Sequence, residues 1–352
     1  MKIGIYTDVH CCYTSSILPI HCESSQYTTR LQMIVDTFKW MYGVFRNNNV
    51  DVIVNCGDLF DSFNLKAQEI SAMSEALSYG GDIPELHILG NHDIFDKKRS
   101  ANAIALLNNY SHIDVVTDPL KLGCGVSLLP YCDADEAADV IPSLSNDILF
   151  SHIDIKGSYV TPQHVLDSGV SSSRLQDNFK RVINGHLHSP QSFDNQVFNI
   201  GASTSLSFSD GDDYIPRISV IDTNTLTLYH FNNPHAICFR KIDSGTLQKV
   251  QSLIDRTYNK LCIRVKCEPE HKVDITNLLS NSDKVVAYKV ITNYSEKTLN
   301  DEEESEKFEA DISQDIAETF KQFVHTRDDL KYPVSAYDEA ISSLKGGDDG
   351  ES

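Results

Sequence analysis

The chain has 352 residues, a formal net charge of −20 and 41% hydrophobic residues. This length fits one large domain with smaller appendages, and the apolar content is ordinary for a protein with a buried core. No run of about 18 apolar residues occurs, and the start MKIGIYTDVH lacks the layout of a signal peptide. Nine cysteines without paired spacing favour free thiols. We therefore expect a cytoplasmic protein that does not span a membrane.

The charge is distributed unevenly, which bears on nucleic-acid binding. Residues 1–235 carry a net charge of −13, residues 236–295 a net +4 and residues 296–352 a net −11. An acidic protein binds nucleic acid only where bound cations, a basic region or a partner provides positive potential. The middle region is the basic one, and weak DNA binding is expected of the chain alone.

Short apolar runs alternate with amphipathic segments in residues 1–235, the pattern of a layered α/β domain. Helices are predicted at residues 29–45, 66–79 and 100–110, the first because its apolar residues recur at helical spacing. Strands are predicted at residues 2–7, 50–55, 85–89, 113–117, 125–130, 147–152, 181–185, 217–222 and 226–231.

Residues 236–295 are predicted to form a small α/β domain. Arg264 and Lys266 share one face of an alternating strand, so they are either DNA phosphate contacts or part of a solvated strand face. Ser244 is the predicted cap of the first helix. The predicted elements are strands at 236–242, 260–268 and 284–291 and helices at 244–258 and about 273–280.

Residues 296–352 read as an acidic linker followed by a helical tail. Apolar residues recur at helical spacing from Phe308 to Phe323, and Pro333 opens a shorter helix. This apolar stripe can pack on its own domain or bind a partner protein.

Polar side chains suited to metal binding follow five of the predicted strands. In a layered α/β domain, ligand sites form beyond the carboxyl ends of the strands, so these five loops are expected to converge. Without metal, such a cluster would bury ionisable groups at a cost of several kcal/mol each. The loops are TDVH (Asp8, His10), NCGDLFD (Asp58), LGNHD (Asn91, His92, Asp93), FSHID (His152) and NGHLH (His186, His188).

The last of these loops contains two histidines one residue apart. If the preceding strand continued, His186 and His188 would point to one face and toward one point in space. Two exposed turn histidines are the alternative for such a pair taken alone.

The five motifs together resemble the calcineurin-like metallophosphoesterases, whose signature is D-x-H, G-D-x-x-D, G-N-H-[DE], H and G-H-x-H. Within that superfamily the chain looks most like the SbcD-type double-strand-break repair nucleases, especially phage-encoded members. The resemblance covers residues 1–235 closely and includes IGASTSLSFSDGDD after the histidine pair. It implies a layered sandwich of two β-sheets flanked by helices, a small α/β capping domain at 236–295 and a C-terminal helical tail at 296–352.

The resemblance also implies a site for two divalent metal ions. Asp8, His10 and His188 would hold one ion, Asn91, His152 and His186 the other, and Asp58 would bridge them. The Asp, His and Asn ligands suit Mn²⁺ or a similar borderline ion. His92 would support the transition state and protonate the leaving oxygen, and Asp93 would orient His92.

Two groups of residues near these motifs have other interpretations. Asp61 stands where archaeal and eukaryotic relatives have a second catalytic histidine, and a carboxylate that bonds a loop amide is the expected role. Cys11, Cys12, His21 and Cys22 match no standard zinc spacing, so a loop beside the site is favoured over a zinc site.

The main hypothesis is a metal-dependent DNA phosphodiesterase. The resemblance implies 3′-to-5′ exonuclease activity on duplex DNA and single-strand endonuclease activity, in DNA end processing, recombination and repair. It also implies a homodimer that binds an SbcC-like SMC-type ATPase through its C-terminal helices, in a bacterial cytoplasm or a phage-infected cell. A calcineurin-like phosphatase and a non-catalytic scaffold subunit are the alternatives; Ser62, in place of the Arg-Gly of protein phosphatases, disfavours the first.

Overall fold

The fold is taken from a computed structural model, which describes residues 1–13, 18, 25–95, 99, 101–161, 164–208 and 214–292. The chain divides into two compact units, Met1–Ile291 and Thr292–Ser352. The predicted acidic linker and helical tail, 296–352, lie outside the described residues and stay a prediction, as do His21 and Cys22. Among the helices of the described residues, none has the length and apolar character needed to cross a membrane.

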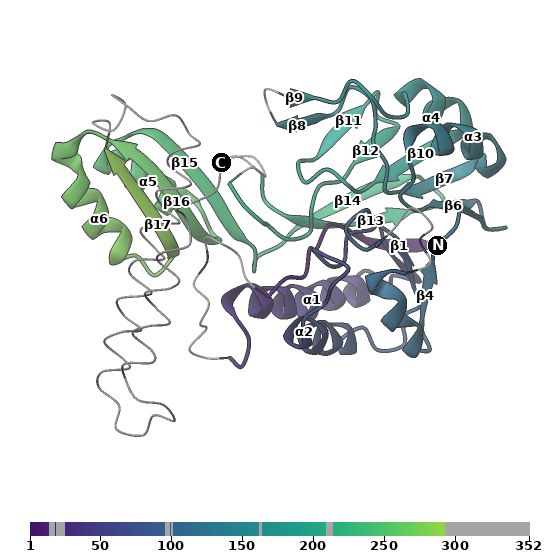
Figure 1. Cartoon of the computed structure of the whole chain (residues 1–352), viewed down its shortest axis with the longest axis horizontal. Coiled ribbons are helices and arrows are strands. Elements are labelled where there is room, and N and C mark those ends of the chain that lie inside the picture. Colours follow the sequence, from purple (N-terminus) through teal and green to yellow (C-terminus); the bar gives the residue numbers. More distant parts are fainter. Residues whose placement is uncertain are drawn as a thin grey trace, which may run out of the picture. The chain divides into compact units, whose positions relative to one another are not determined.

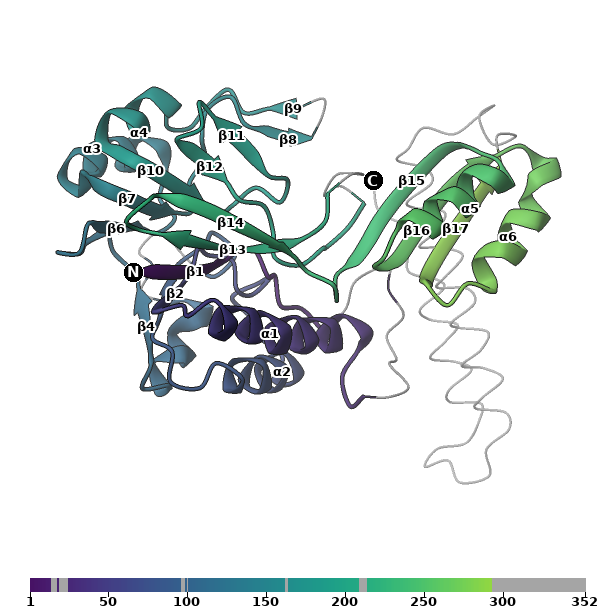
Figure 2. The same ribbon diagram turned by 180° about the vertical axis from the view of Figure 1, so that it is seen from behind.

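The first sheet has six strands in the order β14-β13-β1-β2-β3-β4. The strands β1 to β4 run parallel, whereas β13 and β14 are antiparallel to their neighbours. The first strand of the chain therefore lies between β2 and the late strand β13 (Figure 2). The bounds are β1 (Lys2–Tyr6), β2 (Val52–Asn55), β3 (Glu85–Ile88), β4 (Ile113–Val116), β13 (Arg217–Asp222) and β14 (Thr227–Asn232).

The second sheet also has six strands, in the order β11-β12-β10-β7-β6-β5. Its central strands β12, β10, β7 and β6 are parallel, and β11 and β5 are antiparallel edges. The bounds are β5 (Leu120–Lys121), β6 (Val126–Leu129), β7 (Asn146–Ser151), β10 (Phe179–Asn184), β11 (Gln191–Phe193) and β12 (Val197–Asn199). A separate two-stranded sheet is formed by β8 (Tyr159–Thr161) and β9 (His164–Val165).

The two six-stranded sheets pack face to face. Ile3 and Ile5 of β1 share one buried cluster with Ile148 and Phe150 of β7 and with Ile183 of β10. Because residues two apart on a strand point to the same face, this alternation places one apolar row of each sheet in the interface. The expected layered sandwich is confirmed.

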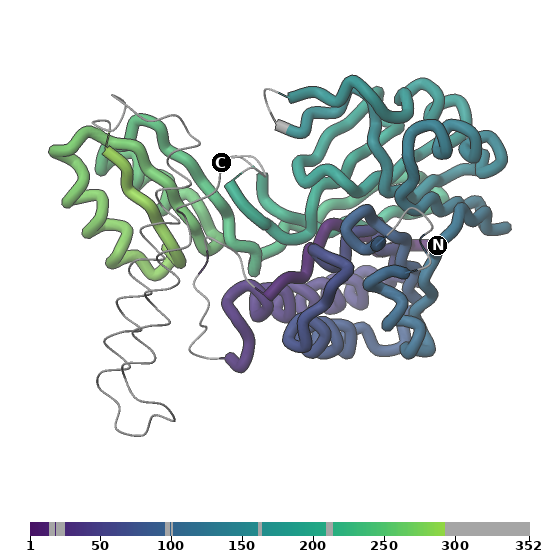
Figure 3. Tube along the Cα trace, viewed as in Figure 1, coloured from purple at the N-terminus to yellow at the C-terminus, as the bar shows by residue number. Residues whose placement is uncertain are grey.

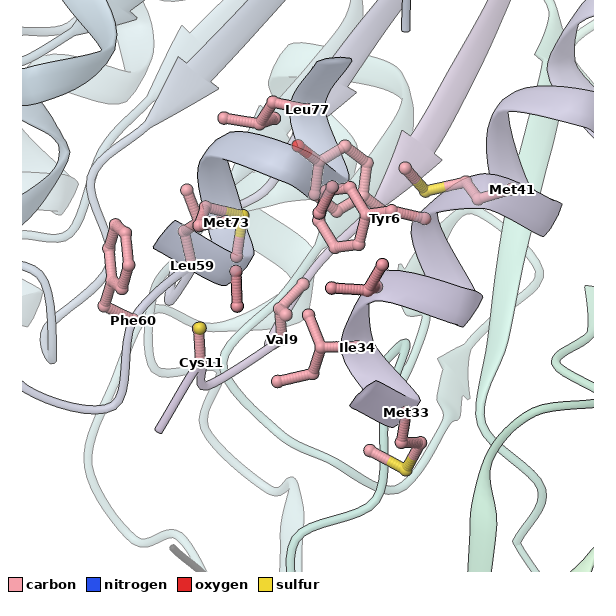
Figure 4. Packing of buried hydrophobic residues seen from close by; sticks show 14 of the residues in the cluster. Tyr6, Val9, Cys11, Met33, Ile34, Met41, Leu59, Phe60, Met73 and Leu77 are labelled. Carbon is pink, nitrogen blue, oxygen red and sulfur yellow. The ribbon is translucent and has the colours of Figure 1, made fainter. Parts of the chain in front are cut away.

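Helices cover the outer faces of the sandwich, as Figure 1 shows. The outer face of the first sheet is covered by α1 (Thr29–Asn47) and α2 (Ala67–Ser78). Tyr6 and Val9 lie in one buried cluster with Ile34, Met41 and Met73 (Figure 4). The second sheet is covered by α3 (Ala134–Leu144) and α4 (Ser172–Asn178), which pack through their own apolar cluster. Each large buried side chain contributes roughly 1.5–3 kcal/mol.

Residues 236–292 form a small α/β unit, whose chain can be followed in Figure 3. Its sheet has the order β15-β16-β17, with β15 parallel to β16, and its helices share a buried cluster with the sheet. The bounds are β15 (Ile237–Gly245), α5 (Leu247–Arg256), β16 (Lys260–Cys267), α6 (Lys272–Ser280) and β17 (Val285–Thr292), with a short 3-10 turn at Pro269–His271. The boundary predicted after residue 235 lies inside the first compact unit.

Some local predictions are wrong. Ser244 does not cap α5, because β15 continues through Gly245; Thr246 is the cap, and its side chain accepts from the backbone N–H of Lys249. The helix expected at 100–110 is a 3-10 helix, Ala103–Asn109. The sequence reading also missed α3, α4 and the short strands β5, β8, β9, β11 and β12.

Candidate metal centre

The five predicted loops leave the carboxyl ends of parallel strands β1, β2, β3, β7 and β10. At that edge the chain turns sharply, and four non-glycine residues adopt positive φ: Asp8 (49°), His10 (45°), Asp58 (52°) and His186 (78°). Such a conformation costs of order 1–3 kcal/mol each and concentrates at functional sites. Four instances within the candidate ligand loops mark this edge as a site.

The first ligand group is Asp8, His10 and His188. His188 Nε2 lies 3.0 Å from His10 Nε2, and Asp8 Oδ1 lies 3.9 Å from the same His10 nitrogen. Asp8 and His10 are buried, and Asp8 Oδ1 has no hydrogen-bond partner. The other oxygen, Asp8 Oδ2, accepts from Thr7 Oγ1 at 2.6 Å and from the His186 backbone N–H at 3.1 Å.

The second ligand group is Asp58, His152 and His186, joined by Asn91. His186 Nδ1 lies 3.2 Å from His152 Nε2. Asn91 Oδ1 lies 3.0 Å from the first of these nitrogens and 3.1 Å from the second. Three donor atoms from three loops therefore face one small volume.

Asp58 lies between the two groups. Its Oδ2 is 3.2 Å from His152 Nε2 and 3.6 Å from His10 Nε2, one histidine from each group. Its Oδ1 accepts from the His92 backbone N–H at 2.9 Å. One carboxylate oxygen thus faces both groups while the other holds the loop of His92.

The donor atoms fit two divalent cations. A fully buried carboxylate oxygen without a partner is costly, and two imidazole nitrogens about 3 Å apart must share a proton or face a cation. A cation beside Asp8, His10 and His188 and another beside Asn91, His152 and His186 would satisfy these atoms, with Asp58 shared. Among the described residues neither group contains a cysteine, and nitrogen and oxygen donors suit borderline metals.

In three of the ligand histidines, the ring nitrogen that faces away from the ligand group has a hydrogen-bond partner. Asp61 Oδ1 lies 3.2 Å from His10 Nδ1, and Asp154 Oδ1 lies 2.9 Å from His186 Nε2. The Cys56 carbonyl oxygen lies 2.6 Å from His152 Nδ1. Such acceptors orient a ligating imidazole and fix its tautomer. A loop-amide partner was expected for Asp61; among the described residues, the contact that its carboxylate makes is with the imidazole of His10.

His92 and Asp93 differ in their surroundings. His92 is exposed, its Nδ1 lies 2.9 Å from the Asp61 carbonyl oxygen, and its ring meets that of His10 edge to face at 4.8 Å. Asp93 is buried and accepts from the backbone N–H groups of Asp58, Phe60 and Gly90 at 3.0, 3.2 and 2.9 Å. Asp93 therefore joins two loops and does not orient the His92 ring as expected, a role that the Asp61 carbonyl takes.

Burial and neighbouring charges shift several pKa values in the centre. Burial alone would raise the pKa of Asp58, but His152, followed by His10 and His92, lowers it below its usual range. Burial and the charge of Asp58 raise the pKa of Asp93 to about 7. Burial lowers the pKa of His152, but Asp58 outweighs it and raises that pKa to about 9. For His10, in contrast, burial outweighs the neighbouring carboxylates and lowers the pKa, so positive charge is favoured at His152 but not at His10.

At two glycines of the ligand motifs, the backbone passes too close to neighbouring side chains for a Cβ atom to fit. A Cβ at Gly90 would lie 2.0 Å from Asp58 Oδ1, and one at Gly185 would lie 2.2 Å from Thr7 Oγ1. Only glycine lets these backbones pass so near the ligand carboxylates and their supports.

The sequence reading missed Arg30 and Asp154. Arg30 in α1 is buried, and its guanidinium donates to the Val9 carbonyl at 2.8 Å, the His10 carbonyl at 3.1 Å and Thr204 Oγ1 at 3.0 Å. It also bonds the Ser205 carbonyl. An arginine in an amphipathic helix resembles a surface residue, so only the three-dimensional contacts reveal this role. Asp154 is the last residue of the FSHID motif, two residues after His152. This position in a ligand motif is the sequence feature that could have identified it.

The remaining candidates lie apart from the ligand groups. The Arg264 guanidinium lies 4.6 Å from the centre of the Phe208 ring and is half-buried, whereas Lys266 is exposed. Cys11 is buried, and its thiol points to the Glu69 carbonyl at 3.9 Å. No candidate metal group among the described residues includes Cys11 or Cys12.

Comparison with known proteins agrees with this centre. The family model for calcineurin-like phosphoesterases matches residues 1–190, more than half of the chain. The chain belongs to this family. As a metallophosphoesterase it is a metal-dependent hydrolase of phosphoesters. Among curated proteins none matches the sequence.

Solved structures show only distant likeness. An archaeal phosphodiesterase is 15% identical, with 66% of this chain and 99% of that chain covered and a TM-score of 0.36. A protein of Thermus thermophilus is 11% identical, with 66% and 98% covered and a TM-score of 0.39. A dimetal phosphatase of Danio rerio is 11% identical, with 62% and 91% covered and a TM-score of 0.37. At these scores the likeness carries no argument about this metallophosphoesterase's substrate.

Proposed function

We propose that this metallophosphoesterase is a Mn²⁺-dependent DNA phosphodiesterase, a 3′-to-5′ exonuclease on duplex DNA and an endonuclease on single strands. The observation that carries the proposal is the position of Asp58, whose Oδ2 faces a histidine of each ligand group within 3.6 Å, with exposed His92 beside it. Two bound cations would supply Lewis-acid polarisation of the phosphoryl group and a hydrolytic water of lowered pKa.

The chain's own residues then have distinct tasks. The Asp61 carbonyl can only accept, so His92 Nδ1 carries the proton of that hydrogen bond and Nε2 is the nitrogen left for substrate. His92 in its imidazolium form can protonate a leaving oxygen through Nε2. Asn91 supplies a neutral oxygen where a phosphodiester anion must approach, and Asp93 keeps the Asp58 and His92 loops together.

Charge on the small unit supports a DNA substrate over a small phosphomonoester. A cavity of about 590 Å³ at β15 and α5 is lined by Arg240, Lys241, Lys249 and Arg256, and no carboxylate is among the described residues that line it. Clustered basic side chains are the usual contacts for phosphate backbones. They provide local positive potential on a chain whose net charge is −20. Arg264 and Lys266 remain candidate contacts on the neighbouring strand.

The partner assignments are also proposals. The apolar stripe of residues 308–323 would bind an SbcC-like SMC-type ATPase, the nuclease would act as a homodimer, and the complex would work in a bacterial cytoplasm or a phage-infected cell. Residues 296–352 carry a net charge of −11, so they would repel the DNA backbone. This acidity favours a protein as the binding partner of the segment.

A digestion assay tests the proposal. The full chain, with and without the ATPase, is incubated with Mn²⁺ and end-labelled linear duplex DNA, and His92→Gln is assayed beside it. We expect shortening from 3′ ends by the wild type and loss of cleavage in His92→Gln with Mn²⁺ binding retained. Hydrolysis of a nitrophenyl monoester without DNA cleavage would replace the proposal with a phosphatase. Unchanged activity of the complex with His92→Gln would instead indicate a scaffold.

A further inference from the structure

Two exposed aromatic side chains lie in the loops that carry Asp58 and His92 of the metal centre. Phe63 is 45% exposed and Phe95 is 61% exposed, although both are large and apolar. Their ring centres are 4.7 Å apart and the planes are inclined by 58°. The rings contact each other while a large part of each remains open to solvent, so the pair forms a small aromatic platform.

The platform is built on the two loops that carry Asp58 and His92. Phe63 follows Asp61 by two residues, and the Asp61 carbonyl holds the His92 ring at 2.9 Å. Phe95 follows His92 by three residues, and its backbone N–H donates to the Ala101 carbonyl at 3.0 Å. These spacings place the Phe63 backbone within about 7 Å of Asp61 and the Phe95 backbone within about 11 Å of His92.

The backbone that carries the platform is held by hydrogen bonds and packing. Asp93 bonds the backbone of Asp58, Phe60 and Gly90, which ties the two loops together. Phe60 is buried in the core, and Ile94 pairs with Asn102 in an isolated β-bridge. The rings are therefore presented by ordered backbone, which lowers the entropic cost of binding a ligand.

The area of the platform suits one flat ring. With about 150–250 Å² for each whole phenylalanine, the exposed parts sum to roughly 200 Å². A stable protein interface buries about 800 Å² on each partner, whereas unpaired nucleobases stack singly on aromatic side chains. A nucleobase is the occupant that matches both the size and the place beside a phosphodiester-cleaving centre.

We propose that Phe63 and Phe95 stack the unpaired base of the nucleotide next to the scissile phosphate, and so set a preference for base-bearing strand ends. This inference rests on the proposed nuclease function. A base inside a duplex has no free face, so the platform selects frayed or single-stranded ends.

The test compares two oligonucleotides that differ only in the 3′-terminal nucleotide, which carries either adenine or no base. Single-turnover kcat/KM is measured with Mn²⁺ for the full-length wild type, for Phe63→Leu/Phe95→Leu and for Phe63→Tyr/Phe95→Tyr. We expect the wild type to favour the base-bearing end by roughly 10- to 100-fold, as one aromatic stack allows. The leucine variant should reduce this ratio to within about threefold, and the tyrosine variant, which keeps the rings, should retain it.

A control variant and a binding measurement separate stacking from other effects. Tyr258→Leu removes a 99% exposed aromatic residue from the small unit and should leave the ratio unchanged. In the His92→Gln background, a 2-aminopurine at the 3′ end should change its fluorescence on binding, and the leucine variant should abolish that change.

Failure of the aromatic platform and failure of the proposed nuclease function give different results. An equal preference ratio in wild type and leucine variant overturns the platform, as does a leucine variant that changes the oligomeric state in light scattering, since the pair would then be an interface between copies. No cleavage of either oligonucleotide by the wild type overturns the nuclease function, and the platform with it.

Discussion

The metal centre and the small unit of residues 236–292 differ in what they bury. The centre encloses polar groups, Thr7, Asp8, His10, Asp58 and His152 among them, on a backbone with four positive-φ residues. The small unit encloses apolar side chains such as Val250, Ile263 and Val265, and its described non-glycine residues all have negative φ. The centre therefore depends on polar contacts between distant loops, whereas the small unit depends on regular amphipathic patterning.

The largest effect is expected from Asp58→Asn. The change removes the charge that faces both ligand groups, so we expect activity to fall more than about 1,000-fold and metal content to fall at both sites. Manganese content by elemental analysis and phosphodiester hydrolysis are the measurements. Asp139→Asn, an exposed carboxylate in α3, is the matched control. Full metal content in Asp58→Asn would show that the two groups do not depend on this carboxylate.

A second prediction concerns Arg30, the buried arginine that bonds the loop of Asp8 and His10. Arg30→Met removes the donor to the carbonyls of His10 and Ser205 and one of the two donors to the Val9 carbonyl, which keeps its bond from Thr204 Oγ1. We expect the free energy of unfolding to fall by about 3 kcal/mol. Urea unfolding in chelator measures the loss without a metal contribution. Arg46→Met is the control in the same helix, where an exposed guanidinium bonds one carbonyl, and should change stability by less than about 0.5 kcal/mol. Equal losses would mean that the Arg30 contacts contribute little.

The sequence located the ligand loops because their residue types follow buried strands, and parallel strands end at one edge of a sheet. It could not locate Arg30, since an arginine in an amphipathic helix has the same pattern whether it faces solvent or a carbonyl cluster. The strand does not continue through His186 and His188, which was the condition for both rings to point to one face: β10 ends at Asn184, and His186 takes a φ of 78°. The two rings consequently lie in different ligand groups.

Roles within a motif were harder to predict than positions. Asp93 is adjacent to His92 in sequence, yet its carboxylate faces three backbone N–H groups, while a carbonyl from another loop holds the His92 ring. Neighbouring residues in a tight turn point in different directions, so sequence adjacency does not identify a hydrogen-bond partner. The helix α3 contains Pro142, and a proline inside a helix contradicts local propensity, which makes this helix hard to predict from sequence.

A third prediction separates the two ligand groups. Asp154→Asn weakens the acceptor that fixes the His186 tautomer, so metal affinity should fall about 10- to 100-fold at the site of His152 and His186 and much less at the other. Calorimetric titration of the full chain with Mn²⁺ resolves the two events. Asp167→Asn, an exposed carboxylate in the same segment, is the control. Equal weakening at both sites would contradict the assignment of Asp154 to one group.

The smallest effect is expected in the small unit, where local patterning governs stability. Thr246 Oγ1 accepts from the Lys249 backbone N–H at the start of α5, so Thr246→Ala should lower the free energy of unfolding by about 1 kcal/mol. Ser244→Ala is the control: Ser244 lies in β15, and its hydroxyl accepts from the Lys249 ammonium at an exposed position, so its loss should change stability little. Mn²⁺ affinity should be the same in both variants, because neither position touches the ligand loops. If Ser244→Ala lowers the free energy of unfolding more than Thr246→Ala does, Ser244 and not Thr246 is the cap of α5.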